Sequence, residues 1–407
     1  MKRTTTACVV ALLLCLGGTT AMAQSTTPKG TWTVTSFGLY AYWLDGFIPS
    51  GASIDILYAG ARLLPGLDTI IEVDPGAGWQ SNDFYLNPDG SHYTGPYTGG
   101  NTSPSFSSPV AFLGPTSGGN SPTIYDQAEF MSDFGIRQGI VWNPDQKRNL
   151  LEGFLFYRAR YDANSVATEW GQQDTLLNQS TFPDRAEIFS NALLAGLSMN
   201  TVATDPVHKT EQGIYGEASA EWGPGFFFNG LGGADYYRLN ATLKMFQTLF
   251  TKSTAADAGM NLLSAYLADY VGIDYAGGSS VPIQVFESFG GRYMRMGNST
   301  TIHGLDDGNY ATGLKLINNL ELRVVGPAIA WPDLEPALFV FLDTAYYDGY
   351  FQQPANTASG VLGSTGAGIY VNVFDLADLN LYVAFPFAGA RINGSPYAIS
   401  AAFNLAF

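Results

Sequence analysis

The sequence predicts an all-β fold, a transmembrane antiparallel up-and-down β-barrel of about 16 strands. Three observations predict it. Segments of about ten residues alternate apolar side chains with polar or small ones, as the strands of such a barrel do. The composition is rich in glycine and aromatic residues. After residue 23, no segment has the roughly 18 uninterrupted apolar residues of a membrane helix. A chain that spans a membrane without such helices must do so as a closed barrel.

The first 23 residues have the pattern of a secretory signal peptide. Lys2 and Arg3 give a positive start, residues 7–17 form an apolar stretch, and Ala21-Met22-Ala23 is a small-residue cleavage site. We therefore expect export from the cytoplasm and a bacterial outer membrane as the destination.

Beyond the signal, we expect a short periplasmic segment at 24–33 and the barrel at 34–407. Both cysteines, Cys8 and Cys15, lie in the signal. The mature chain is therefore expected to lack thiols, disulfides and cysteine-ligated metals.

The net charge of the chain limits the kinds of molecule that it is expected to bind. Without Lys2 and Arg3, the chain has 17 basic residues against 35 acidic ones, a formal net charge of -18. Phosphate repels such a chain, so nucleic acid is not an expected partner. Only 13% of all residues are charged while 14% are aromatic, a balance that disfavours disorder.

The alternation separates a membrane barrel from a soluble sandwich, whose strands also alternate. In 314–324 the even positions are mostly apolar, whereas Lys315 and Arg323 lie on the odd face. The segments 150–161 and 237–249 repeat this arrangement. Charges within strands, opposite a continuous apolar face, favour a barrel with a polar lumen and a lipid-facing exterior.

Fifteen strands are predicted from this pattern, and a sixteenth is sought in 80–124, around 109–113, because bacterial single-chain barrels have even strand numbers. In chain order the fifteen are 34–43, 53–62, 67–79, 127–142, 150–161, 190–200, 212–222, 235–249, 260–274, 283–295, 313–325, 336–346, 361–373, 378–387 and 397–407. The last strand ends in Phe407, which resembles the carboxy-terminal assembly signal of bacterial outer-membrane barrels.

Catalytic and metal-binding motifs are not found. His92, His208 and His303 are far apart in sequence, and no G-x-S-x-G elbow occurs. The glycine-rich run 363–368 precedes no helix pattern, so it reads as a bent strand. Residues 306–309 lack the ligand spacing of a calcium loop and read as a turn. We expect no enzyme activity, cofactor or metal.

A series of motifs in the second half occurs in an order that resembles a known superfamily. The motifs are Phe286-Glu287-Ser288-Phe289-Gly290-Gly291, Ile302-His303-Gly304-Leu305, Asn319-Leu320-Glu321-Leu322-Arg323 and Phe339-Val340-Phe341-Leu342-Asp343, with looser likenesses at 196–201 and 212–213. Together they resemble the BamA-type bacterial surface antigen superfamily, the outer-membrane insertase and two-partner-secretion barrels. The likeness covers 190–407.

The resemblance implies a lumen site. Ile302, His303, Gly304 and Leu305 take the place of the superfamily's loop tip, which folds into the lumen. Glu321, Arg323 and Asp343 would then form a lumen charge network, with Asp343 as the expected partner of the tip and Arg323 as its competitor. The alternative is that this network only makes a wide barrel rigid.

Two departures from the superfamily pattern bear on this expectation. The superfamily has an arginine at the tip, where this chain has His303, and a neutral imidazole offers one donor instead of five. The segment 24–33 is too short for periplasmic POTRA domains, so we expect a resemblance to the short, POTRA-less branch.

Three functions remain open from the sequence. The first is membrane protein assembly, protein translocation or lipid handling, together with a separate periplasmic partner. The second is a passive, porin-like pore for small solutes. The third is a structural surface antigen with a plugged lumen. In each case the expected partners include outer-membrane lipid and the general assembly machinery that inserts the barrel.

Overall fold

The computed structural model describes the residues that form the barrel wall and part of its lumen. They are 31–43, 50–61, 63–64, 67–85, 122–144, 148–165, 188–227, 229, 234–253, 261–296, 301–305, 312–329, 334–350, 357–373, 377–389 and 396–405. The predicted signal peptide, the strand sought near 109–113 and Phe407 lie outside these residues.

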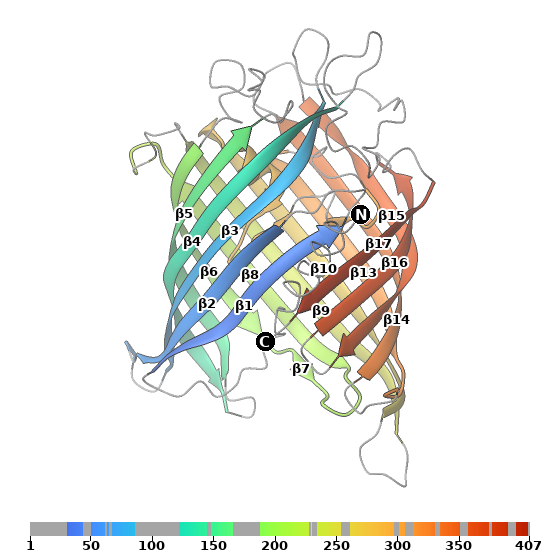
Figure 1. The fold of residues 1–407 in the computed structure, drawn as a ribbon. Coiled ribbons are helices and arrows are strands. Elements are labelled where there is room, and N and C mark those ends of the chain that lie inside the picture. The colour runs from blue at the N-terminus through green and yellow to red at the C-terminus, as the bar shows by residue number, and fades with distance from the viewer. Residues whose placement is uncertain are drawn as a thin grey trace, which may run out of the picture.

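A single antiparallel sheet of fifteen strands dominates the described residues, which confirms the predicted fold class (Figure 1). Its strands are β1 (Thr31–Trp43), β2 (Ser50–Ala61), β3 (Thr69–Tyr85), β4 (Pro122–Asn143), β5 (Arg148–Ser165), β6 (Ile188–Asn200), β7 (Ala203–Thr204), β8 (Glu211–Gly223), β9 (Asp235–Ser253), β10 (Asn261–Ser280), β13 (Leu314–Val325), β14 (Leu334–Tyr350), β15 (Thr357–Val373), β16 (Ala377–Ala388) and β17 (Ala398–Leu405).

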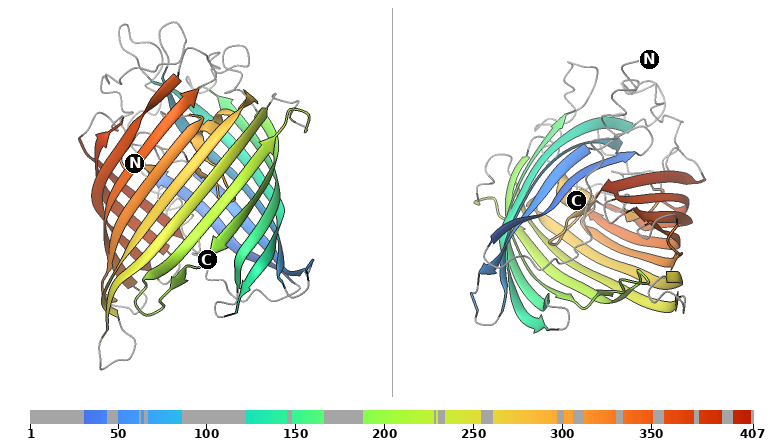
Figure 2. Two further views of the ribbon diagram at one scale, coloured as in Figure 1. Left: turned by 180° about the vertical axis from the view of Figure 1, so that it is seen from behind. Right: turned by 60° about the horizontal axis from the view of Figure 1, so that its bottom comes forward.

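Neighbours in the chain are neighbours in the sheet, which is the up-and-down topology. The short β7 adds two residue pairs to the end of β8, and β8 also pairs with β6 and β9. The sheet curves into a ring of tilted strands (Figure 2). The tilt and curvature are those of a barrel wall.

The ring is weakest between β1 and β17. These strands register at only two residue pairs, Tyr42 with Ala402 and Trp43 with Ala401. By contrast, β1 registers with β2 from Thr31 to Ala41. The wall is therefore not closed along most of this seam, and Figure 2 shows the two strands diverging.

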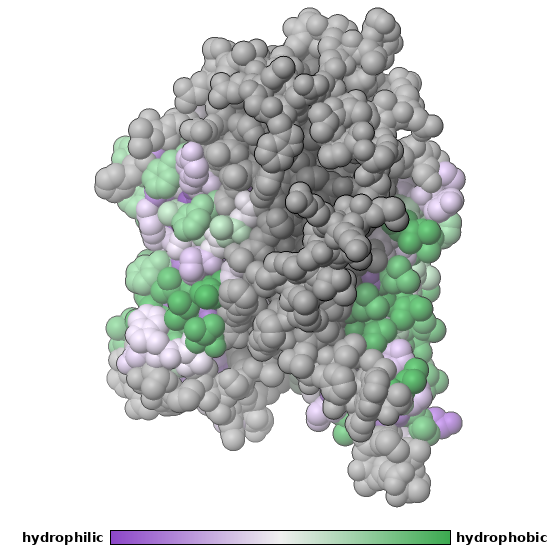
Figure 3. Space-filling model, in the orientation of Figure 1, coloured by the Kyte–Doolittle hydropathy of each residue, from purple (hydrophilic) through white to green (hydrophobic). Residues whose placement is uncertain are grey.

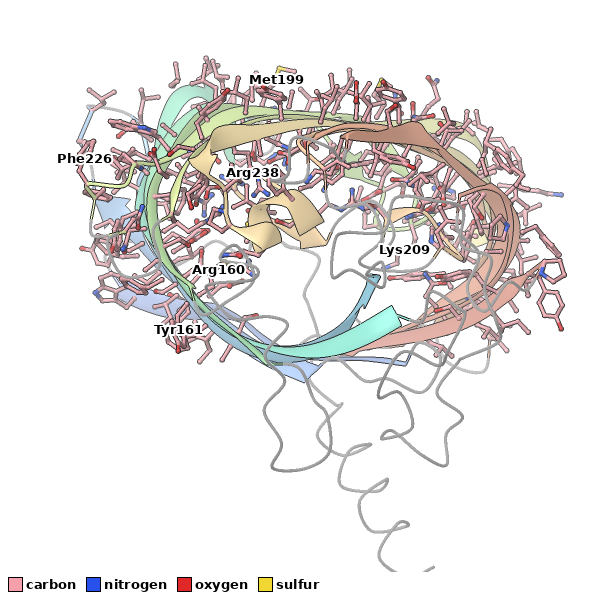
Figure 4. The ribbon with its side chains drawn as sticks, turned by 90° about the horizontal axis from the view of Figure 1, so that it is seen from above. Arg160, Tyr161, Met199, Lys209, Phe226 and Arg238 are labelled. Carbon is pink, nitrogen blue, oxygen red and sulfur yellow. The ribbon has the colours of Figure 1, made fainter. Side chains whose placement is uncertain are left out.

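The two faces of the wall differ as the alternation predicts. On β9, Leu239 is 52% exposed on the outer face, while the neighbouring Arg238 is 1% exposed on the lumen side. Figure 4 shows Arg160 inside the ring and Tyr161 outside it. Hydrophobic side chains gather over the wall on both sides of the view in Figure 3.

This outer apolar surface extends over many strands. Exposed large apolar residues include Leu155, Leu197, Leu243, Ile273, Leu338, Val340, Val361, Ile369, Leu381 and Phe385. Such a surface is unfavourable in water and favourable in a bilayer.

One predicted strand is wrong. Residues 283–295 do not join the wall but form the helix α2 (Ile283–Glu287) and two short strands, β11 (Ser288–Phe289) and β12 (Arg295–Met296), which pair only with each other. Their apolar side chains face the packed lumen instead of lipid. Apolar side chains are stabilised in both environments, so the same sequence pattern fits either one. In the part of the chain that the structure describes, no helix has the length and apolar character to cross a bilayer.

Candidate functional site

The candidate site is the lumen, where a segment between β10 and β13 folds inward. We call residues 283–296 and 301–305 the lumen segment. In Figure 4 the ribbon of α2 lies within the ring of strands. Burial of apolar side chains holds this segment inside, since Phe286, Phe289, Ile302 and Leu305 are each at most 3% exposed. Phe289, Ile302 and Leu305 pack in one cluster with Ile317 of β13.

The structure places the loop tip against Asp343. The backbone N–H of His303 donates to Asp343 Oδ2 at 2.9 Å, and His303 Nδ1 lies 2.6 Å from the same oxygen. Asn319 Nδ2 donates to Asp343 Oδ1 at 2.9 Å and to the carbonyl of Thr301 at 2.8 Å. Asp343 is fully buried, so these donors replace the water that a carboxylate would otherwise need.

Strand register explains why these groups meet. Asn319 of β13 is directly opposite Asp343 of β14, so both side chains project from the lumen face at one level. The Gly304 backbone has φ of +78°, and a Cβ there would lie 2.7 Å from Ala384 Cβ. A glycine at the tip therefore lets the loop turn tightly against the wall.

Aromatic rings enclose the imidazole. The His303 ring centroid lies 4.4 Å from that of Phe341 and 4.5 Å from that of Tyr382. These rings limit the directions in which the imidazole can turn, and they leave Nδ1 facing Asp343.

The other two residues of the predicted charge network lie apart from this contact. Arg323 Nε donates to Glu321 Oε2 at 2.7 Å, and Arg323 Nη1 donates to the Tyr266 hydroxyl at 3.2 Å. Glu321 and Arg323 thus form a local pair on β13, while Asp343 takes His303 and Asn319.

The His303–Asp343 contact is the first of three groups of residues, here called anchors, that hold the lumen segment against the wall. The second anchor was not predicted from the sequence. It consists of Arg238 on β9, Asp274 on β10 and Lys315 on β13, which are each at most 1% exposed. Asp274 Oδ2 lies 3.3 Å from Arg238 Nε and 3.5 Å from Lys315 Nζ. The backbone N–H of Gly290 donates to Asp274 Oδ1 at 3.0 Å.

Both cations of this anchor donate to the lumen segment. Lys315 Nζ donates to the carbonyls of Phe286 at 2.7 Å and Ser288 at 2.6 Å. Arg238 Nη2 donates to the carbonyls of Val285 and Ser288. The anchor therefore places two positive charges beside one carboxylate, and both cations also donate to backbone carbonyls of the lumen segment.

A third anchor holds the next turn of the segment. Arg158 Nη2 donates to the carbonyl of Gly291 at 3.2 Å, and it pairs with Asp133 at 2.7 Å. Glu217 Oε1 accepts the backbone N–H of Arg292 at 2.7 Å. The Arg292 guanidinium in turn pairs with Glu152.

One signal in the sequence points to these residues. Arg158, Arg238 and Lys315 all lie on the charged, lumen-facing parity of their strands. Parity tells which side of the wall a charge faces but not which partner it meets, since Arg292 and Glu152 are 140 positions apart.

No family model and no curated protein matches the chain. Among solved structures it is similar to BamA from Haemophilus ducreyi lacking POTRA domains 1–3, with 12% identity, a TM-score of 0.48, and coverage of 93% of this chain and 70% of that one. It is also similar to CdiB from Escherichia coli, with 9% identity, a TM-score of 0.49, and coverage of 91% and 62%. For CdiB from Acinetobacter baumannii the values are 12%, 0.45, 88% and 50%.

The chain thus spans half to about three fifths of the length of the two CdiB chains. The function of this chain is therefore inferred from its own residues.

Proposed function

We propose that this chain is an outer-membrane barrel that handles macromolecules, in protein assembly, protein translocation or lipid transfer, with a separate periplasmic partner. The observation that carries the proposal is the anchored lumen segment. Charged groups from β5, β8, β9, β10, β13 and β14 converge on it. An occupied lumen does not suit a passive pore, which needs an open water-filled channel.

The weak seam supports transfer sideways into the membrane. Only two residue pairs join β1 to β17, so few backbone hydrogen bonds must break for these strands to part. A purely structural antigen would favour a fully paired seam, because a closed barrel satisfies more backbone hydrogen-bonding groups in lipid.

Conductance in planar bilayers tests the lumen. We expect purified protein to conduct weakly, because the lumen segment fills part of the channel. A steady, large conductance of the unmodified protein would support the passive pore instead.

Photo-cross-linking in cells tests the handling of macromolecules. Tyr370 faces the lumen and Ile369 faces outward with 43% exposure, so a photoreactive phenylalanine analogue at each position compares the two sides of one strand. We expect adducts with polypeptide or lipid at 370 that differ from those at 369.

Two engineered disulfides test, in the same cells, whether β1 and β17 must separate for the adducts at 370 to form. A cysteine pair at 42 and 402 joins β1 to β17, and a control pair at 383 and 399 joins β16 to β17. We expect the first disulfide to reduce the adducts at 370 and the second to leave them unchanged. Adducts that are identical at 369 and 370, or unaffected by both disulfides, would count against the proposal.

A further inference from the structure

A group of polar side chains lies on the outer, lipid-facing side of the wall. This group, which we call the polar patch, consists of Gln247 on β9, Asp269 on β10, Asn318 on β13 and Thr344 on β14. Asp269 projects outward because Asp274, five positions along the same strand, faces the lumen, and the pairing of β10 with β13 is continuous between them. Asn318 projects outward because the next residue, Asn319, faces the lumen.

Strand register brings the members of the polar patch close together. Asn318 is directly opposite Thr344, and on its other side it is opposite Val271, two positions from Asp269. Gln247 is opposite Leu267, which is also two positions from Asp269. The patch therefore runs across four neighbouring strands. In the left view of Figure 2, yellow β10 and orange β13 lie side by side in the part of the wall that faces the viewer.

The polar patch lies inside the apolar band of the exterior. Along β10, the outward side chains of Leu263 and Ile273 are 40% and 46% exposed on either side of Asp269. Leu320 on β13 and Leu342 on β14 are outward neighbours of the patch and are exposed as well. A carboxylate among such residues faces lipid, which destabilises a barrel unless the carboxylate has partners.

The contacts within the chain satisfy this patch only in part. Asn318 Nδ2 donates to Asp269 Oδ1 at 2.5 Å and to the carbonyl of Tyr270 at 3.4 Å. Asp269 Oδ2, Asn318 Oδ1 and the Gln247 amide have no hydrogen-bond partner among the residues that the structure describes. Lipid tails offer neither donors nor acceptors, so a protein with polar groups at the same depth is a better neighbour for the patch.

A second copy of this chain meets that requirement. Two barrels inserted in the same orientation are related by a rotation about the membrane normal, which places their patches at the same depth. A two-fold rotation also reverses the left-to-right order of β10 and β13. The amide donor of Asn318 then faces the carboxylate acceptor of Asp269 in the other copy. Hydrogen bonds between polar side chains stabilise such contacts inside a membrane.

We propose that the polar patch is the contact surface of a two-fold symmetric dimer of this barrel in the membrane. The contact uses the outer face of β9, β10, β13 and β14, so it leaves the lumen and the seam between β1 and β17 free. The inference goes beyond the proposed function and does not depend on it.

A single cysteine next to the patch tests the contact in isolated outer membranes. Leu320 is directly opposite Asp269 and is 37% exposed, so Leu320→Cys places a thiol at the dimer surface of a mature chain that is expected to have no other. Leu155→Cys is the control, because Leu155 is exposed on the outer face of β5. With a membrane-permeable oxidant, we expect at least tenfold more covalent dimer from the first variant than from the second.

Two double variants test the side chains themselves. Asp269→Leu with Asn318→Leu removes the polar pair and suits lipid, so the barrel should fold and keep its fast-migrating form in unheated gels. In lipid nanodiscs or detergent, we expect this variant to dimerise at least tenfold more weakly than the unmodified protein. Asp269→Asn with Asn318→Asp is the matched control, since it exchanges donor and acceptor and should preserve the dimer.

Several results would overturn the inference. The unmodified protein is monomeric at every protein-to-lipid ratio, or the double leucine variant dimerises as well as the unmodified protein. Equal cross-linking at 155 and 320 would mean random collision between barrels. A cross-link from 320 to a different protein, identified by mass spectrometry, would assign the patch to that protein instead of a second copy.

Discussion

At the scale of single residues, His303 and Asp343 connect the loop tip to the wall. The two positions are 40 apart in sequence, yet the structure brings backbone, imidazole and carboxylate together. The imidazole reaches the carboxylate because the backbone N–H of His303 also contacts Asp343, which holds the ring close to that carboxylate.

A cysteine pair at 303 and 343 should form a disulfide under oxidation if the tip lies in the lumen. The mature chain is expected to contain no other thiol, so the product would be unambiguous. A pair at 303 and 323 is the control, since 323 is four residues from 319 along β13, or about 13 Å. Non-reducing gel mobility before heating reports the bond. A cross-link in the control pair only would place the tip elsewhere.

Lys315 and Asp274 allow a double-mutant cycle. Each is fully buried, and removing one partner of a buried ion pair costs up to about 3–5 kcal/mol. Lys315→Met should cost less than Asp274→Asn, because Arg238 still pairs with Asp274, whereas Asp274→Asn removes the carboxylate that both cations contact. We expect Lys315→Met and Asp274→Asn each to lower the unfolding temperature in detergent.

The double variant should lose less than the two single losses added together, because the Lys315–Asp274 contact counted in both single losses is lost only once. Strictly additive losses would show that the two residues do not interact.

At the scale of elements, the glycines of β15 are explained by the strand beside it. The sequence favours a strand over a phosphate-binding loop for 363–368, and the structure places this run within β15. A Cβ on Gly366 would lie 2.1 Å from the carbonyl oxygen of Val383 and 2.5 Å from the ring of Phe341. The missing side chain makes room for the ring that packs against His303.

Gly366→Ala should therefore destabilise the barrel by about 1–3 kcal/mol, the usual cost of an extra methyl in a packed site. Gly153→Ala is the control, because its Cβ would have no neighbour closer than 3.6 Å. Thermal unfolding in detergent, followed by circular dichroism, measures both. Equal unfolding temperatures for the two variants would contradict the packing argument.

The connection from β7 to β8 contains a carboxylate that organises its own turn. Asp205 Oδ1 accepts the N–H groups of Val207 and His208, and Oδ2 lies 2.8 Å from His208 Nδ1. Slight burial raises the pKa of Asp205, but the hydrogen bonds from the His208 ring and from both backbone amides outweigh it and lower the pKa below its ordinary 3.8.

Because its folded pKa is lowered, Asp205 stabilises this turn fully above pH 3.8, and the stabilisation is lost as the pH falls through the lowered value. Hydrogen-exchange protection of the Val207 and His208 amides should fall in that range. The Thr201 amide, which donates to the Ile214 carbonyl, is the internal control. In Asp205→Asn the change should disappear, and its persistence would assign it to another group.

At the scale of the whole molecule, the wall has two faces of opposite character. The exterior is apolar over many strands, and the lumen is ionic and filled in part by the chain itself. Away from the seam between β1 and β17, antiparallel pairing between successive strands stabilises this wall, since each strand pairs its backbone groups with those of its neighbours.

We expect the mature protein to fractionate with the outer membrane and to keep a compact, fast-migrating form in detergent gels until it is heated. Circular dichroism should show a β spectrum in the unheated sample. Recovery of the protein in the soluble periplasm, or a helical spectrum, would contradict the membrane barrel.

The sequence by itself determined the wall of this protein. Side chains alternate with a period of two in a strand, so Leu239 and Arg238 must face opposite sides, whatever the rest of the chain does. The positions of Asn319 and Asp343 on the lumen face follow from the same periodicity.

Only the tertiary structure decided what fills the lumen. Apolar residues such as Phe286 and Phe289 gain by leaving water, whether lipid or packed protein receives them, so the sequence pattern alone placed 283–295 in the wall when it lies inside. The choice of partners was likewise decided by the tertiary structure, because the inward fold of the lumen segment brings Arg292 to Glu152 and Gly290 to Asp274, which no local sequence pattern pairs.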